Sequence, residues 1–130
     1  MLWNFLAVAL GGAIGSCIRY GVSLCYNGTH SVFALPTLSV NVIGSLAIGL
    51  LYAYCSNYSV PTPMKMFLFV GLLGGFTTFS SFSLETVNML RNGYLGAAAV
   101  YSLGSLVVGV LMAFGGVYLG DKLIGWIEGF

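Results

Sequence analysis

Long runs of apolar residues, separated by short polar segments, make up most of this chain. A helix needs roughly 20 mostly apolar residues to cross a hydrocarbon core of about 30 Å, because each residue rises about 1.5 Å. Four runs reach this length, and they cover about residues 3–26, 36–55, 64–90 and 95–119. The segments between them are rich in Asn, Gly, Pro and Ser, which favour turns. The pattern therefore predicts an all-α membrane protein, with four transmembrane helices forming a single domain over residues 1–130.

The composition agrees with this fold class and excludes several functions. Hydrophobic residues make up 58% of the chain and charged residues only 5%, whereas soluble domains carry about 25% charged residues. No basic run is present, so nucleic-acid binding has no electrostatic basis. No cluster of His, Cys or carboxylate residues is available for catalysis, and the chain is therefore not expected to be an enzyme.

The few charges do not orient the protein in the membrane. An even number of spans puts both termini on one side, together with Lys65 and Lys122, while Arg91 and Arg19 belong to the other side. Positive charges normally mark the cytoplasmic side, and here they are balanced. The balance predicts a chain that inserts in both orientations and pairs with an inverted copy of itself. The alternative is a weak bias that the cell still resolves.

Glycine residues recur at helical spacing within the apolar runs. Gly11 and Gly15 lie four apart in the first run, and Gly71 and Gly75 lie four apart in the third. Helices in lipid associate through such small-residue faces, because small residues let two backbones approach closely. Most of these glycines are therefore expected to serve helix packing.

Residues 74–78 of the third run have a different character. Their sequence is Gly-Gly-Phe-Thr-Thr, and paired glycines next to β-branched residues weaken a helix. Interrupted backbone within a membrane exposes carbonyls and amides, and it is tolerated where protein, water or an ion satisfies them. The segment predicts that the third helix is broken near the bilayer midplane. The alternative is a kinked, continuous helix whose threonine hydroxyls satisfy the backbone.

Three side chains after the predicted break share one helix face, because Phe79, Phe82 and Glu85 are spaced three apart. The edges of aromatic rings carry the positive end of the ring quadrupole. Two phenylalanines in edge-on contact would therefore favour a dehydrated anion. The alternative is that both rings contact lipid or other core residues.

Polar residues inside the second and fourth runs suggest a track across the membrane. Asn41 lies within the second span and Ser45 one turn further, while Tyr101, Ser105 and Gly109 follow one another at intervals of four in the fourth. The Asn41 amide offers two N–H donors to an anion. The alternative is that these groups only hydrogen-bond one helix to another.

The motifs resemble those of the Fluc family of fluoride channels over nearly the whole chain, in order, spacing and total length. The following segments carry the resemblance: Gly11-Gly12-x-x-Gly15-Ser16-x-x-Arg19-Tyr20, Asn41-x-x-Gly44-Ser45 and Gly71-x-x-Gly74-Gly75-Phe76-Thr77-Thr78-Phe79-Ser80-Ser81-Phe82-x-x-Glu85.

The resemblance implies an antiparallel homodimer with two pores. It implies that a sodium ion is held at the dimer interface by the carbonyls matching Gly74 and Thr77. It places Arg19 at the pore vestibule and Glu85 at the pore mouth. The family's polar track has a further serine where this chain has Gly109. The remaining pore lining would be Asn41, Thr78, Phe79, Ser80, Ser81, Phe82, Tyr101 and Ser105.

The role implied is passive export of fluoride across the inner cell membrane, which protects a microbial cell from fluoride toxicity. An alternative is a proton-coupled exporter of the small multidrug type, which has a similar length and also four spans. Such an exporter needs a carboxylate within the membrane, and Glu85 is the candidate. Its position toward the end of a span argues against that role.

Overall fold

The protein is all-helical, and the computed structural model describes residues 1–129 of it. Four helical segments are long and apolar enough to cross a membrane, which confirms the predicted class. Large apolar side chains are exposed over the outside of the bundle, as expected for a surface in contact with lipid. The elements are α1 (Leu2–Cys25), α2 (Leu35–Asn57), α3 (Thr62–Lys65), the π-helix η1 (Met66–Leu73), α4 (Gly74–Phe76), α5 (Phe79–Arg91) and α6 (Leu95–Glu128).

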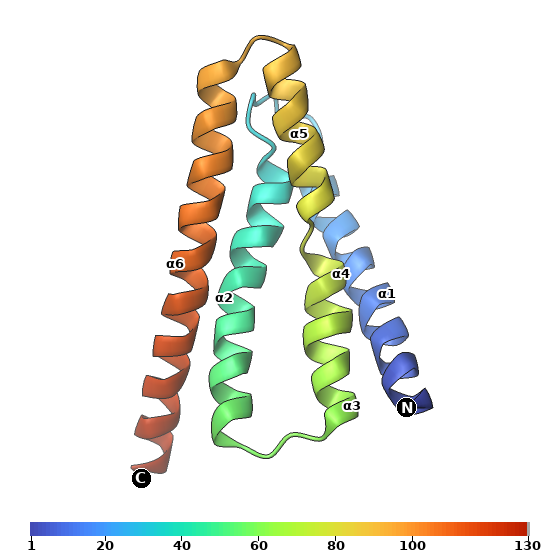
Figure 1. Ribbon diagram of the computed structural model, residues 1–130, viewed down its shortest axis with the longest axis vertical. Coiled ribbons are helices and arrows are strands. Elements are labelled where there is room, and N and C mark those ends of the chain that lie inside the picture. Colours follow the sequence, from blue (N-terminus) through green and yellow to red (C-terminus); the bar gives the residue numbers. More distant parts are fainter. Residues whose placement is uncertain (130) are drawn as a thin grey trace.

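The helices pack as two pairs. Figure 1 shows α2 running beside α6, while α1 lies along α3, η1 and α4, and both chain ends lie at the same end of the bundle. Turns with glycine at positive φ precede α2 and α6, at Gly28 (φ 84°) and Gly93 (φ 83°). Only glycine adopts this conformation without strain. The predicted turns at residues 27–30 and 91–93 are thus present.

Glycines set the spacing within each pair. A Cβ on Gly15 would overlap the backbone carbonyl of Leu72, and a Cβ on Gly75 would lie 2.7 Å from the carbonyl oxygen of Gly12. The second pair meets in the same way at Gly49 of α2 and Gly116 of α6, which come too close for any side chain. Backbone contact of this kind is how helices associate in lipid. The packing role expected for the glycines of the first and third runs is confirmed.

The last helix is longer than its predicted span. We expected the span to end near Leu119, before a polar segment, but α6 continues to Glu128. Gly120 packs against Ala53 and Leu50 of α2, and the Asn57 amide donates a hydrogen bond to Asp121 (3.3 Å). These contacts with α2 keep the polar residues helical.

The third span consists of several segments of different backbone conformation. It passes from α3 into a π-helix at Met66 and returns to α-helix at Gly74. Thr77 (φ −84°, ψ 161°) and Thr78 (φ −151°, ψ 125°) are then extended, and α5 begins at Phe79. The two extended residues are threonines, whereas the paired glycines Gly74 and Gly75 before them are helical.

Candidate functional site

Asn41 of α2 pairs with the extended backbone between α4 and α5. Its Nδ2 donates a hydrogen bond to the Thr78 carbonyl (2.9 Å), and the Thr78 N–H donates to Asn41 Oδ1 (2.8 Å). One amide side chain thus satisfies both backbone groups of a residue that has left the helix. Inside a membrane, such groups need a partner within the protein.

Further side chains hold the same segment in place. Thr78 caps α5, because its Oγ1 accepts a hydrogen bond from the Ser81 N–H (3.3 Å). Both the N–H and the hydroxyl of Thr77 donate to the Leu73 carbonyl. Arg19 of α1 donates from Nε to the Gly75 carbonyl (3.0 Å). The segment is therefore fixed by α1 and α2 as well as by its own threonines.

Two of these hydrogen bonds use backbone N–H groups, those of Thr78 and Ser81, that would bond to backbone carbonyls in a continuous helix. In a continuous helix, the N–H of Thr78 would bond to the Gly74 carbonyl, and that of Ser81 would bond to the Thr77 carbonyl. The first amide instead reaches Asn41, and the second reaches Thr78 Oγ1. The carbonyls of Gly74 and Thr77 therefore lose their usual donors. Backbone oxygens of this kind suit a hard cation such as sodium.

A cavity of about 400 Å³ lies between α2, the third span and α6. We call it the aromatic cavity, because the rings of Phe69, Phe79 and Phe82 face it. No charged side chain lines it among the residues that the structure describes. The rest of its lining is Asn41, Gly44, Ser45, Ile48, Leu73, Gly74, Thr77, Thr78, Ser105, Leu106 and Gly109.

Three aromatic rings follow one another beside this cavity. The ring centroids of Phe79 and Phe82 are 5.7 Å apart, and those of Phe82 and Tyr101 are 5.3 Å apart. Both spacings fall within the range of favourable aromatic pairs. Phe79 is 79% exposed in the single chain, so one face of the row is open at the surface of the bundle.

Ser105 contributes a hydroxyl without a protein partner. Its Oγ is buried, and it has no hydrogen bond within the described part of the chain. A buried hydroxyl left unpaired costs about 1–3 kcal/mol. Because Ser105 lines the aromatic cavity, a water or an anion inside the cavity is the natural acceptor for its proton.

Glu85 is held by two hydroxyls from neighbouring helices. Thr37 of α2 donates to Oε1 (2.6 Å), and Tyr101 of α6 donates to Oε2 (2.8 Å). Thr37 is only 7% exposed, and the sequence reasoning missed it. The available signal was a polar residue directly after Pro36, at the start of a span.

Two further cavities are connected to the first one in sequence, each sharing a lining residue with the one before it. The arginine cavity, of about 430 Å³, shares Thr78 with the aromatic cavity, and its lining is Ser16, Arg19, Tyr20, Ser23, Pro36, Thr37, Val40, Thr78, Ser81 and Glu85.

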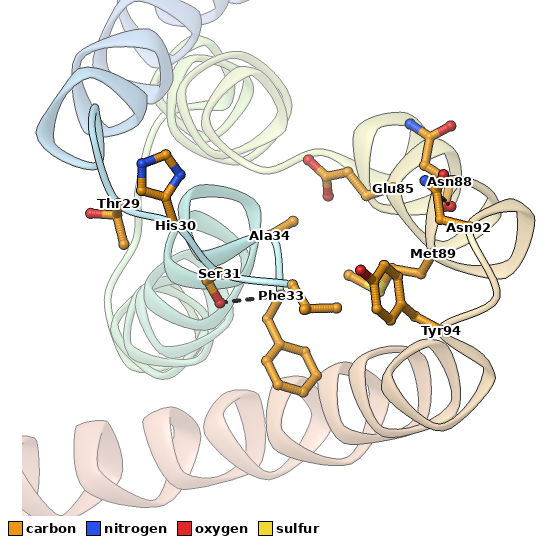
Figure 2. Close-up of a pocket in the computed structure, with 11 residues that line it drawn as sticks. Thr29, His30, Ser31, Phe33, Ala34, Glu85, Asn88, Met89, Asn92 and Tyr94 are labelled. Atoms are coloured by element: carbon orange, nitrogen blue, oxygen red, sulfur yellow. Dashed lines mark hydrogen bonds between the residues drawn. The ribbon is translucent and has the colours of Figure 1, made fainter.

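The loop cavity, of about 600 Å³, shares Glu85 with the arginine cavity. Figure 2 shows Asn88 of α5 and Asn92, which follows the last residue of α5, along one side of it and His30 of the loop before α2 on the other. The three cavities therefore follow one another from the helix ends toward the middle of the bundle.

The predicted site residues are thus divided among these places. Asn41, Thr78, Phe79, Phe82 and Ser105 meet at the aromatic cavity, together with Gly74 and Thr77. Arg19, Ser81 and Glu85 meet at the arginine cavity. Tyr101 reaches the site through Glu85 and Phe82, while Ser80 is exposed and lies 3.5 Å from the Thr78 hydroxyl.

This arrangement suits a small anion better than a cation. The aromatic cavity offers amide and hydroxyl donors and three phenylalanine side chains, and no carboxylate lines it among the described residues. The positive charge nearest to it belongs to Arg19, in the adjoining cavity. No group of three or more His, Cys, Asp or Glu side chains placed to hold a metal occurs within residues 1–129.

Known proteins resemble the chain over nearly all its length. A Thermus thermophilus protein named fluoride-specific ion channel FluC is 46% identical over 123 residues, covering 94% of this chain and 97% of its own. Proteins of the same name from Methylobacillus flagellatus (46% identical, covering 95% of each chain) and Parabacteroides distasonis (41%, covering 98% and 100%) are also similar. The family described as CrcB-like protein, Camphor Resistance (CrcB), matches residues 6–117, and the chain belongs to this family.

Proposed function

We propose that this chain is a channel that lets fluoride leave the cell passively across the inner membrane. The observation that carries the proposal is the uncharged aromatic cavity, in which two phenylalanine rings lie beside amide and hydroxyl donors. Relatives that are 41–46% identical over almost the full length carry the name of a fluoride-specific ion channel. The cavity suits a small anion, and the name of the relatives specifies that anion as fluoride.

The cavity supplies what a dehydrated fluoride ion needs. Hydrogen-bond donors from Asn41 and Ser105 replace part of the hydration shell, and the positive edges of the Phe79 and Phe82 rings replace another part. Ring edges attract an anion weakly, so the ion is able to move on. Fixed positive charge is confined to Arg19 in the neighbouring cavity, where it raises the local anion concentration without trapping the ion.

The three adjoining cavities describe a path for the ion. It enters at the loop cavity, passes Glu85 at the mouth and then the vestibule beside Arg19 and Ser81. From there it passes Thr78 into the aromatic cavity. Glu85 borders the first two cavities, but the hydroxyls of Thr37 and Tyr101 donate to its two oxygens and disperse its charge. Ser80 lies beside Thr78 at the end of α5 that faces the interruption.

Fluoride release from proteoliposomes tests the proposal. Vesicles loaded with potassium fluoride are expected to release fluoride when a potassium ionophore balances the charge, and to retain chloride under the same conditions. A fluoride electrode measures the release. Passive channel flux requires no proton gradient, whereas an exporter of the small multidrug type does. Release that depends on a pH gradient, or no release at all, would contradict the channel.

The working unit that we propose is an antiparallel homodimer with two pores. Phe79 is 79% exposed in the single chain although it belongs to the aromatic row. An inverted copy of the chain would cover this ring and complete the pore wall. Lys65 and Lys122 lie on one side and Arg91 on the other, while Arg19 donates to the Gly75 carbonyl within the bundle. The charge difference between the two sides is therefore small, which allows both orientations in one membrane.

The dual orientation predicts partial labelling from one side of the membrane. The three free cysteines, Cys17, Cys25 and Cys55, are first replaced, and one reporter cysteine is added at the C-terminus. A membrane-impermeant maleimide applied to intact inverted vesicles should then label about half of the protein, and the rest only after permeabilisation. Labelling of all copies from a single side would contradict dual topology.

We further propose that a sodium ion lies at the dimer interface, held by carbonyls of Gly74 and Thr77 from both copies near the bilayer midplane. The support is the loss of the usual amide donors of these two carbonyls. Bound sodium supplies the positive charge that carbonyl oxygens within a membrane need. Its role would be structural.

Removal of sodium is therefore expected to weaken the dimer. A ligand that binds only the assembled state stabilises it by about 2.7 kcal/mol at 100 times its Kd. Protein prepared throughout in potassium or N-methylglucamine salts should show a larger monomer fraction and a lower thermal midpoint than protein in sodium, at matched ionic strength. Equal dimer fractions in the three salts would argue against the ion.

A further inference from the structure

Gly109 leaves an opening at one end of the aromatic cavity. It lies one helical turn after Ser105 on α6, and both residues line the cavity. A Cβ placed on Gly109 would meet Ser45 Oγ of α2 at 3.6 Å, an ordinary van der Waals distance. A methyl group would therefore fit there, and the missing side chain leaves space beside Ser45.

The two serines at this opening have complementary hydrogen-bonding capacity. Ser45 Oγ donates its proton to the Asn41 carbonyl (2.7 Å), which leaves its oxygen free to accept. Ser105 Oγ is buried and has no partner within residues 1–129, so its proton is free to be donated. The opening thus has one free acceptor and one free donor.

We propose that this opening holds one water molecule, which Ser45 and the missing side chain of Gly109 position so that it contacts the anion as the anion passes. The water donates one O–H to Ser45 Oγ and the other to the anion, while Ser105 donates its own O–H to the anion. Every donor then has an acceptor. The cavity of about 400 Å³ has room for a water beside the ion, and Ser45 and Ser105 supply polar groups at this part of its wall. The inference rests on the proposed fluoride function and names the part of the hydration shell that the ion keeps.

Gly109→Ala tests the proposal, because a methyl group fits the opening but displaces the water. We expect this variant to release fluoride from proteoliposomes about tenfold more slowly than the wild type, the effect of one lost hydrogen bond. Gly104→Ala is the matched control. It adds the same methyl group to the same helix, where nothing lies within 4 Å, and it should retain the wild-type rate.

A hydroxyl placed at position 109 is expected to replace the water. Gly109→Ser should therefore release fluoride at close to the wild-type rate. Ser45→Ala removes the acceptor that holds the water, so it should slow the release several-fold. The double variant Ser45→Ala/Gly109→Ser should regain most of the wild-type rate of fluoride release. Each variant is compared as a dimer of wild-type thermal stability, so that misfolding is not read as slow transport.

Two results would overturn the proposal: a wild-type rate in Gly109→Ala, or equal slowing in Gly109→Ala and Gly104→Ala. A wild-type channel that releases no fluoride would instead overturn the proposed function. In that case a high-resolution density map decides the water site. Density beside position 109 and within hydrogen-bonding distance of Ser45 Oγ that disappears in Gly109→Ala supports the site, and its absence in the wild type rejects it.

Discussion

Replacing Phe82 with isoleucine is expected to slow fluoride release by about 30-fold, provided that the dimer still forms. Phe82 is the middle ring of the aromatic row, with its centroid 5.7 Å from that of Phe79 and 5.3 Å from that of Tyr101. Isoleucine keeps apolar bulk but has no quadrupole. The same quadrupole holds a desolvated cation over a ring face with about 2 kcal/mol, and we expect a similar magnitude for an anion at the ring edge. Each 1.4 kcal/mol is a factor of ten.

The control for this variant is Phe114→Ile. Phe114 lies on α6 and is 72% exposed at the surface of the bundle, so the same substitution there removes a ring that lines none of the three cavities. It should leave the rate unchanged. Initial rates are measured at equal amounts of reconstituted dimer. Equal rates in Phe82→Ile and Phe114→Ile would show that Phe82 serves packing alone.

Phe79→Ile also tests whether a second copy of the chain forms part of the pore wall. Phe79 is open at the surface of the single chain, and it acts on the ion only where a second copy closes the pore around it. We expect a slowing similar to that of Phe82→Ile. A normal rate here combined with a slow rate in Phe82→Ile would place Phe79 against lipid and remove the main argument for a pore shared between copies.

The sequence predicted the class of the fold well, because length and hydropathy alone decide which segments can cross a membrane. It did not predict the end of α6, whose polar residues remain helical through Gly120 and Asp121 in contact with α2. It also did not predict the π-helix Met66–Leu73. An apolar segment has the same composition whether its hydrogen bonds span four or five residues, so no local signal was available.

The packing of α2 against α6 shows a second limit. Gly104 and Gly116 both lie on α6, but nothing lies within 4 Å of a Cβ on Gly104, whereas the close approach to α2 occurs at Gly116. Glycines occur around the whole circumference of this helix. Which of them face α2 depends on the rotation of the helix, and composition does not record that rotation.

Two residues of the cavity lining were predicted because each is a polar side chain within an apolar span. Asn41 and Ser105 stand out in this way, and both line the aromatic cavity. Thr37 did not stand out, because a polar residue at the start of a helix is common. Its importance comes from Glu85, which lies 48 residues away in sequence and accepts its hydroxyl proton. Contacts of this range depend on how the helices assemble.

Asn41→Ala is expected to lower the free energy of unfolding by about 2–6 kcal/mol, because it leaves two partly buried backbone groups of Thr78 unpaired at about 1–3 kcal/mol each. Thermal unfolding of the purified protein in detergent measures the loss. Asn41→Asp should lose less, since its carboxylate still accepts from the Thr78 N–H. Asn88→Ala, at an exposed position on α5, removes the same amide as a control and should leave the midpoint unchanged.

The same variant separates two roles for Asn41. If the amide holds the interruption in shape, Asn41→Ala lowers thermal stability and fluoride release together, because the Gly74 and Thr77 carbonyls and the cap of α5 depend on the position of Thr78. If the amide served only as a donor to the anion, release would fall while the thermal midpoint stayed at the wild-type value. That second result would contradict the paired hydrogen bonds as the reason for an asparagine in the middle of a membrane helix.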